Sequence, residues 1–90
     1  MSDPIRTFVV TPHAAEQMKR RGIDESTLEQ VLISPERRLP LRTGRDLLER
    51  IIDFQGRSYL VRVIADVDRM PAEVVTVYRT SKIEKYRREK

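Results

Sequence analysis

The chain contains no cysteine, no tryptophan and a single histidine among its 90 residues. Without cysteine it can form neither a disulfide framework nor a thiolate nucleophile, and one histidine is too few for a zinc finger or zinc ribbon. No apolar run approaches the roughly 18 residues that a membrane-spanning helix needs. The N-terminus also lacks the basic and hydrophobic segments of a secretory signal. We therefore expect a cytoplasmic protein without a cofactor.

Charged residues make up 36% of the chain, with 18 Lys and Arg against 14 Asp and Glu, a net charge of +4. The surplus is small, but the basic residues cluster at 20–21, 37–45 and 82–90. Clusters that converge in space would form a polyanion-binding face, whereas scattered clusters would be an ordinary solvated surface. Apart from Tyr86, the three tyrosines and two phenylalanines lie outside these clusters, which argues against a dedicated platform for stacking single strands.

The order of helix and strand signals predicts a single α+β domain. Thr11 and Asp24 are suitable N-caps, Gly22 suits a left-handed helix end, and Ser34-Pro35 stops the second helix. Apolar alternation then predicts strands at 39–42, 47–54, 59–65 and 73–78, a weaker strand pattern at 5–10, and a short helix after residue 80. Short connections favour antiparallel neighbours. We therefore predict two N-terminal helices packed on a three- to four-stranded antiparallel sheet, with a short C-terminal helix and a free sheet face for a ligand.

The most informative segment is 11–23, which holds the only histidine. His13 follows a capping threonine and Pro12, so it lies in the first helical turn, where the positive end of the helix dipole disfavours a cation. We expect a neutral imidazole that can accept a proton near pH 7. Arg21 lies two turns later on the same side and is a candidate phosphate clamp, with Arg20 as the alternative. Purely structural roles at the two helix ends are the competing interpretation.

Two arginines stand among apolar residues in the predicted strands. Arg62 alternates with Leu60 and Ile64, and Arg50 shares a strand face with apolar side chains. An arginine in such a setting either reaches a carboxylate or faces a groove. The competing interpretation is a buried structural pair with Asp53 or Glu49. Arg62 is thus a candidate catalytic residue and Arg50 a candidate nucleic-acid contact.

Tyr78 ends the last predicted strand and is a candidate to donate a proton or to stack on a base. A buried tyrosine with a satisfied hydroxyl is the alternative. The complete set of predicted nucleic-acid contacts is Arg20, Arg45, Arg50, Lys82 and Lys85.

The run His13-Ala14-x-Glu16-x-Met18-x-x-Arg21-Gly22-Ile23, the helix ending at Pro35 and the strand Val75-Thr76-Val77-Tyr78 resemble small bacterial proteins of domain-of-unknown-function family 4258. The family pattern reads His-Ala-x-x-Arg-Met-x-x-Arg-Gly-Ile. Its members are grouped with RelE-like and BrnT-like toxins, so the resemblance implies a RelE-like toxin fold and metal-independent RNA cleavage. This chain departs from the pattern at Gln17, where the pattern has arginine. By position, Lys19, Arg20 or Arg21 could substitute for that arginine.

The favoured hypothesis is a toxin-like endoribonuclease that cleaves RNA by attack of the neighbouring 2′-hydroxyl. Its catalytic residues would be His13, Arg21, Arg62 and Tyr78. The expected partners are RNA, including ribosome-bound mRNA, an antitoxin protein, and a second copy of the chain in a homodimer. Two alternatives remain open. One is the same fold binding nucleic acid without cutting it, and the other is a protein-interaction module whose basic face meets an acidic partner.

Overall fold

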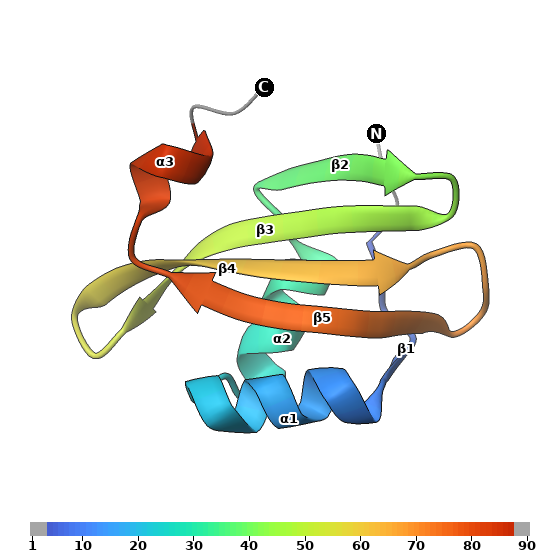
Figure 1. The fold of residues 1–90 in the computed structure, drawn as a ribbon, viewed down its shortest axis with the longest axis horizontal. Coiled ribbons are helices and arrows are strands. Elements are labelled where there is room, and N and C mark those ends of the chain that lie inside the picture. The colour runs from blue at the N-terminus through green and yellow to red at the C-terminus, as the bar shows by residue number, and fades with distance from the viewer. Residues whose placement is uncertain (1–3, 88–90) are drawn as a thin grey trace.

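The computed structural model describes residues 4–87, which form a mixed five-stranded sheet and three helices (Figure 1). The elements follow one another as β1 (Phe8–Val10), α1 (Pro12–Arg21), α2 (Glu25–Ile33), β2 (Arg37–Arg42), β3 (Arg45–Phe54), β4 (Arg57–Asp66), β5 (Ala72–Thr80) and α3 (Ile83–Arg87). The predicted α+β class and the order of helices and strands are confirmed.

The two long helices begin and end where the sequence signals predict. The Thr11 side-chain oxygen accepts the Ala14 N–H at 3.2 Å, and the Asp24 carboxylate accepts the Thr27 N–H at 2.8 Å. Each cap satisfies one of the N–H groups that a helix start leaves unpaired. Gly22 ends α1 with a left-handed φ of 67°. Within residues 4–87, no helix combines the length and the apolar composition needed to cross a bilayer.

The sheet differs from the prediction at one edge. Its strand order is β1-β5-β4-β3-β2, and β2 to β5 form the predicted antiparallel series. The prediction of a purely antiparallel sheet of three to four strands is wrong, because β1 adds a fifth strand that runs parallel to β5, from Phe8↔Ala72 to Val10↔Val74. A parallel partner cannot be reached through a hairpin. Here α1, α2 and three strands lie between β1 and β5 in sequence.

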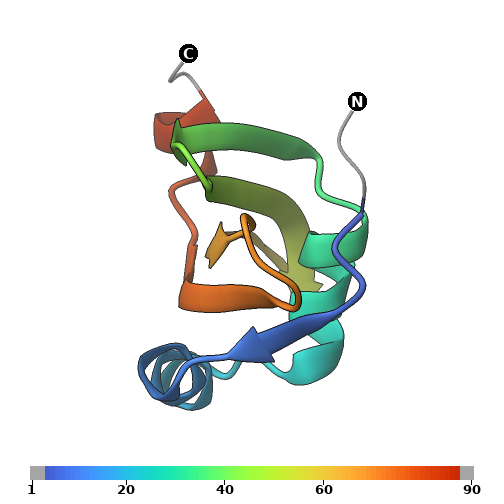
Figure 2. The same cartoon turned by 90° about the vertical axis from the view of Figure 1, so that its right-hand side faces the viewer.

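The two faces of the sheet have different neighbours. α2 packs on one face, while α3 lies on the other side and α1 runs along β5 (Figures 1 and 2). The main core lies on the α2 side and includes Ala14, Leu28, Val31, Leu32, Leu48, Val61, Val63, Ala65, Val74 and Val77. We call the opposite side the distal face. It carries Leu47, Glu49, Ile51, Leu60, Arg62, Ile64, Thr76, Tyr78 and Thr80.

The distal face has an apolar layer of its own. Leu47 is 5% exposed and Leu60 is fully buried, yet neither belongs to the main core cluster. The prediction that Arg62 stands among apolar residues of its strand face is therefore confirmed.

Gln17 has a structural role at the edge of the sheet. Beyond its short pairing with β1, the outer edge of β5 meets α1, and Gln17 Oε1 accepts the Val77 N–H at 2.9 Å. A strand edge under a helix needs such an acceptor, because a buried N–H without one is costly. The arginine of the family pattern could not take this role, since a guanidinium has donors only.

Candidate functional site

Four side chains form a continuous polar row across the distal face. Arg37, Glu49, Arg62 and Tyr78 stand directly opposite one another on β2, β3, β4 and β5. Arg62 Nε donates to Glu49 Oε1 at 3.0 Å, and Arg62 Nη1 donates to the Tyr78 hydroxyl at 2.8 Å. Arg37 Nε lies 3.7 Å from Glu49 Oε2. We call these four residues the distal row.

The centre of the distal row is removed from solvent. Glu49 is fully buried and Arg62 is 8% exposed. Tyr86, from α3, places its ring over the guanidinium, with 4.3 Å between Arg62 Cζ and the ring centroid. A buried charge is tolerated only when it is paired and hydrogen-bonded, and a cation over an aromatic face gains further attraction. The row is therefore a rigid element in which the carboxylate fixes the arginine and the arginine fixes Tyr78.

Tyr78 is the half-buried end of the row. Burial raises the pKa of its hydroxyl above the ordinary 10.0, and the charge and hydrogen bond of Arg62 oppose that rise only in part. The phenol therefore keeps its proton at neutral pH and acts as a donor rather than a base. The hydrogen bond from Arg62 would also stabilise the phenolate formed if the proton left. These two properties together suit a general acid.

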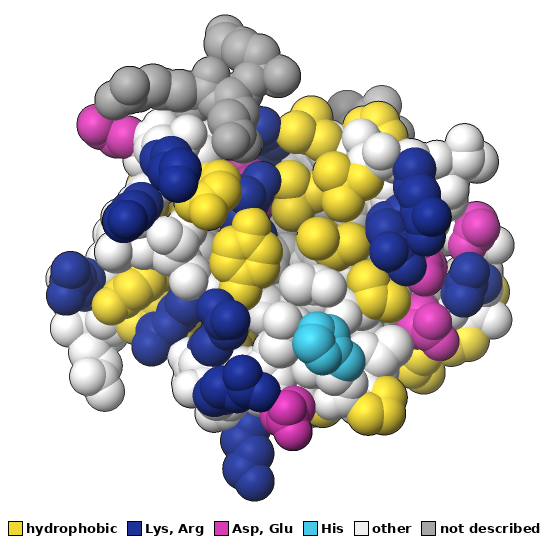
Figure 3. All heavy atoms as spheres, viewed as in Figure 1, with side chains coloured by type: hydrophobic (Ala, Val, Ile, Leu, Met, Phe, Trp, Pro, Cys, Tyr) yellow, Lys and Arg dark blue, Asp and Glu magenta, His cyan; other side chains and the backbone are white. Residues whose placement is uncertain are grey.

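The structure places His13 and Arg21 at opposite ends of α1, and both are exposed. Helix α1 packs along β5, the strand that carries Tyr78. The chain's single histidine, cyan in Figure 3, lies on the side of the molecule that shows the distal face. No hydrogen bond or ion pair within residues 4–87 joins His13 or Arg21 to the distal row. Of the four predicted catalytic residues, the structure thus brings only Arg62 and Tyr78 into contact.

The predicted nucleic-acid contacts are divided between several surfaces. Lys82 and Lys85 are exposed beside α3, on the distal side, where Lys85 Nζ lies 5.8 Å from the Tyr86 ring centroid. Arg20 forms an exposed ion pair with Glu16 along α1 at 2.8 Å. Only the two lysines therefore lie close to the distal row.

Arg50 lies on the other side of the sheet from Arg62. It stands opposite Val61, a core residue, and its Nη1 donates to the Ser34 carbonyl at 2.8 Å. Successive side chains of a strand point to opposite faces, so a residue next to Glu49 cannot join the distal row. Arg50 thus anchors the end of α2 to β3, on the strand face that it shares with apolar side chains as predicted.

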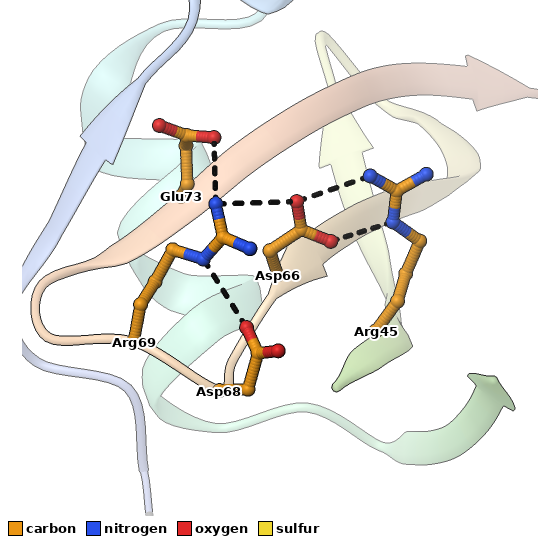
Figure 4. Close-up of polar contacts among 5 residues, drawn as sticks. All are labelled: Arg45, Asp66, Asp68, Arg69 and Glu73. Atoms are coloured by element: carbon orange, nitrogen blue, oxygen red, sulfur yellow. Dashed lines mark hydrogen bonds and ion pairs between the residues drawn. The ribbon is translucent and has the colours of Figure 1, made fainter. Parts of the chain in front are cut away.

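Arg45 belongs to an ion-pair cluster at the opposite end of the sheet from the β3–β4 turn (Figure 4). Its Nε and Nη2 donate to the two oxygens of Asp66 at 2.6 and 3.0 Å. Arg69 bridges Asp66 to Asp68 and Glu73, at 3.9, 3.1 and 3.5 Å. The guanidinium fork of Arg45 is thus bound to a carboxylate, which leaves it poorly placed to clamp a phosphate.

The Asp66 carboxylate should make stability depend on acid pH. The hydrogen bond from Arg45 is the main cause that lowers the pKa of Asp66 below its ordinary 3.8. A lowered pKa in the folded state means that the stabilisation is complete above pH 3.8 and is lost as the pH falls through the folded value. We expect Asp66→Asn to reduce the free energy of unfolding at pH 7 by about 1.5 kcal/mol.

Urea denaturation of both proteins at pH 7 and near pH 2.5 measures this difference. The gap between wild type and Asp66→Asn should shrink in acid, while Asp53→Asn, at an exposed position on β3, should change stability little at either pH. An equal gap at both pH values would contradict a role for the Asp66 charge.

Sequence reasoning missed two members of the site, Glu49 and Tyr86. Glu49 entered only as one of two structural partners for a strand arginine, and the sequence patterns assigned no role in the site to Tyr86. The hairpin register could have identified Glu49, whereas no local signal places Tyr86 over Arg62. In the described part of the chain, no group of three or more His, Cys, Asp or Glu side chains gathers to hold a metal ion.

Comparison with curated proteins and with solved structures gives no match. A family model described as Domain of unknown function (DUF4258) matches residues 10–82. The matched segment runs from the end of β1 through β5, so it contains the α1 motif and the whole distal row. Because it spans most of the 90 residues, the protein belongs to the DUF4258 family.

Proposed function

We propose that the distal face binds RNA and cleaves it without a metal ion, by attack of the ribose 2′-hydroxyl on the adjacent phosphorus. The observation that carries this proposal is the buried chain of hydrogen bonds from Glu49 through Arg62 to the Tyr78 hydroxyl. A buried ion pair adds less stability than apolar residues of similar volume would. Buried charges that fix a proton donor are instead typical of sites that perform chemistry.

In this reaction one side chain accepts a proton and another donates one. His13 takes the proton of the 2′-hydroxyl as O2′ forms its bond to phosphorus, and the P–O5′ bond breaks. Tyr78 gives its proton to the departing O5′, and Arg62 stabilises the resulting phenolate. The products are a 2′,3′-cyclic phosphate and a 5′-hydroxyl end. Arg21 and Lys82 would offset the charge that builds on the phosphate oxygens.

The distribution of charge supports an RNA ligand. Lys and Arg side chains lie along the left-hand side of the view in Figure 3 with few carboxylates among them, whereas those on the right lie beside Asp and Glu. The left-hand side includes α3, the β3–β4 hairpin and the C-terminal end of α1 (Figure 1). A polyanion that followed this side would pass the distal row.

The kinship with RelE-like and BrnT-like toxins is part of the same proposal. A sheet with α2 packed on one face and the distal row on the other supports this kinship. An antitoxin would then act by covering the distal face. Strand addition at the free edge of β2 is less suitable, because Pro40 lacks an N–H and arginines stand at positions 37, 38 and 42.

The direct test is cleavage of a defined RNA by the purified chain in excess chelator, with His13→Ala and Glu29→Ala run beside it. Glu29 is exposed on α2, away from the distal face, and serves as the matched control. We expect cleavage that persists in chelator, survives Glu29→Ala and falls by about 10²–10⁴-fold in His13→Ala. Cleavage unchanged by His13→Ala would remove the histidine from the mechanism, and cleavage abolished by chelator would overturn the metal-independent reaction.

RNA binding without cleavage is the second candidate, and one observation favours it. Two Arg62 donors are engaged by Glu49 and Tyr78, and Tyr86 covers the face of its guanidinium. An arginine held in this way supports a binding surface as well as a catalytic one. Binding that weakens steeply with salt, with no cleavage under any condition including added ribosomes, would establish this alternative.

A further inference from the structure

We propose that a pocket at the tip of the β3–β4 hairpin binds a phosphate group carried by a nucleotide, at a site separate from the distal row. The pocket has a volume of about 420 Å³ and is lined by Gly22, Phe54, Gln55, Arg57, Tyr59 and Arg79. This volume lies within the range of small-molecule sites in proteins. Its lining contains two arginines, two aromatic rings and no carboxylate.

Arg79 is held by its flat face. Its Cζ lies 4.3 Å from the centroid of the Phe54 ring and 4.5 Å from that of Tyr59, and the two rings meet edge to face at 5.5 Å. Stacking fixes the plane of a guanidinium while leaving the N–H groups along its edge able to donate. The rings thus orient Arg79 without consuming its hydrogen-bonding capacity.

The arginines of this pocket differ in their pairing from those of the distal row and of the ion-pair cluster around Asp66. Arg45, Arg62 and Arg69 each form an ion pair with a carboxylate. In the described part of the chain, neither Arg79 nor Arg57 has a carboxylate within ion-pair distance. Arg57 Cζ lies 5.8 Å from the centroid of the Tyr59 ring. Two arginines beside one pocket without an internal counter-ion favour an external anion.

Basic side chains in the last turn of α1 add to the positive field, against the negative end of the helix dipole that lies there. Gly22 closes the pocket, and a Cβ built at this glycine would lie 3.9 Å from Arg79 Nη2, so the helix end approaches the guanidinium closely. The preceding turn of α1 carries Lys19, Arg20 and Arg21. A phosphate here would therefore be attracted by a cluster of cations before it met the two arginines.

Phosphate on a nucleotide suits the pocket better than a simple carboxylate. Arginine binds two phosphate oxygens at once through its planar fork, and aromatic rings beside it offer a surface for a base. Along the sequence the aromatic residues are separate from the basic clusters, but strand pairing places Val61 opposite Arg79 and so brings Arg79 onto the rings of the hairpin.

An NMR titration of the full ¹⁵N-labelled chain tests this site without reference to cleavage. The probes are uridine 5′-monophosphate, inorganic phosphate, a short RNA without a terminal phosphate, and uncharged uridine. We expect the amide signals of Gly22, Gly56 and Arg79 to shift with the phosphate-bearing probes and not with uridine. Tighter binding of the mononucleotide or of the RNA than of inorganic phosphate would support the proposal and show whether a terminal or a strand phosphate is bound. Similar affinity for inorganic phosphate and the mononucleotide would contradict a contribution from the nucleotide.

Arg79→Gln should weaken the binding of the phosphate-bearing probes at least tenfold. Arg42→Gln, an exposed arginine in the hairpin at the other end of β3, removes the same charge and should leave binding within about twofold, since it is remote from the pocket. If Arg79→Gln fails to fold, Arg57→Gln at an exposed position replaces it, with a loss of at least threefold expected. Shifts equal for uridine and the mononucleotide, no shifts at all, or binding unchanged in both pocket variants would overturn the proposal.

Discussion

Glu49→Leu is expected to lower the free energy of unfolding by about 3–5 kcal/mol, because it leaves a buried arginine without its counter-charge. Glu49 is fully buried and Arg62 is 8% exposed. Glu49 Oε1 accepts a hydrogen bond from Arg62 Nε. The side chain of Arg62 cannot reach solvent without moving the Tyr86 ring that covers it. A domain of this size has a total stability of about 5–15 kcal/mol, so this single change would remove a large part of it.

The double variant Glu49→Leu/Arg62→Met should behave quite differently. It replaces both charges by apolar side chains of similar volume, and such exchanges are often neutral or stabilising by about 1–4 kcal/mol. Methionine also suits the space beneath the Tyr86 ring, since a thioether packs well against an aromatic edge. We therefore expect the double variant to be at least as stable as the wild type.

Chemical denaturation followed by circular dichroism measures all members of this cycle. A stable double variant that has lost cleavage would show that the ion pair is kept for chemistry and not for folding. Near-neutral stability of Glu49→Leu would contradict the burial of the pair. A double variant as unstable as the single one would show instead that the distal face requires the pair in order to fold.

How far the sequence predicts the fold is clearest at the two sheet edges. The antiparallel strands follow from apolar alternation and turn residues, which act over a few neighbours. The strand β1 has only three residues, and its partner in β5 lies at the other end of the chain. Its pairing depends on how the helices fold back across the sheet, which no local pattern encodes.

The Gln55-Gly56 turn allows the register that pairs Glu49 with Arg62 to be predicted from the sequence. Both turn residues have positive φ, 55° and 85°, as expected for a two-residue hairpin turn. Such a turn fixes Phe54 opposite Arg57, and stepping outward one residue at a time reaches Glu49 opposite Arg62. The same count places Arg50 on the other face. The bulge between Ile64 and Ala65 does not disturb this result, because it lies beyond Arg62.

The position of Tyr86 could not be obtained in this way. The helix α3 has five residues, and its orientation depends on packing against a sheet face rather than on hydrogen bonds along the chain. The family pattern, which has an arginine at the position of Gln17, likewise gave no indication of the role of this residue. In this chain that position supplies an acceptor for the edge of β5.

The second large effect is expected for Tyr78→Phe, which removes one oxygen atom and keeps the ring. If Tyr78 protonates the leaving O5′, the rate of cleavage at saturating protein should fall by about 10²–10⁴-fold. RNA binding should stay within about twofold, because the cations of the surface are untouched. Stability should fall by about 1 kcal/mol, since Arg62 Nη1 loses an acceptor at a half-buried position.

The pH dependence and a matched variant separate the hydroxyl from the ring. Burial raises the pKa of Tyr78 above 10.0, so the acid form persists across the neutral range and any alkaline fall in rate caused by its ionisation must lie above pH 10. Tyr86→Phe makes the same chemical change but keeps the ring over Arg62, and we expect a much smaller loss of cleavage from it. Equal losses from the two variants would contradict a specific role for the Tyr78 hydroxyl. Undiminished cleavage by Tyr78→Phe would remove Tyr78 as the acid, because the proton delivered to O5′ would then come from another group or from solvent.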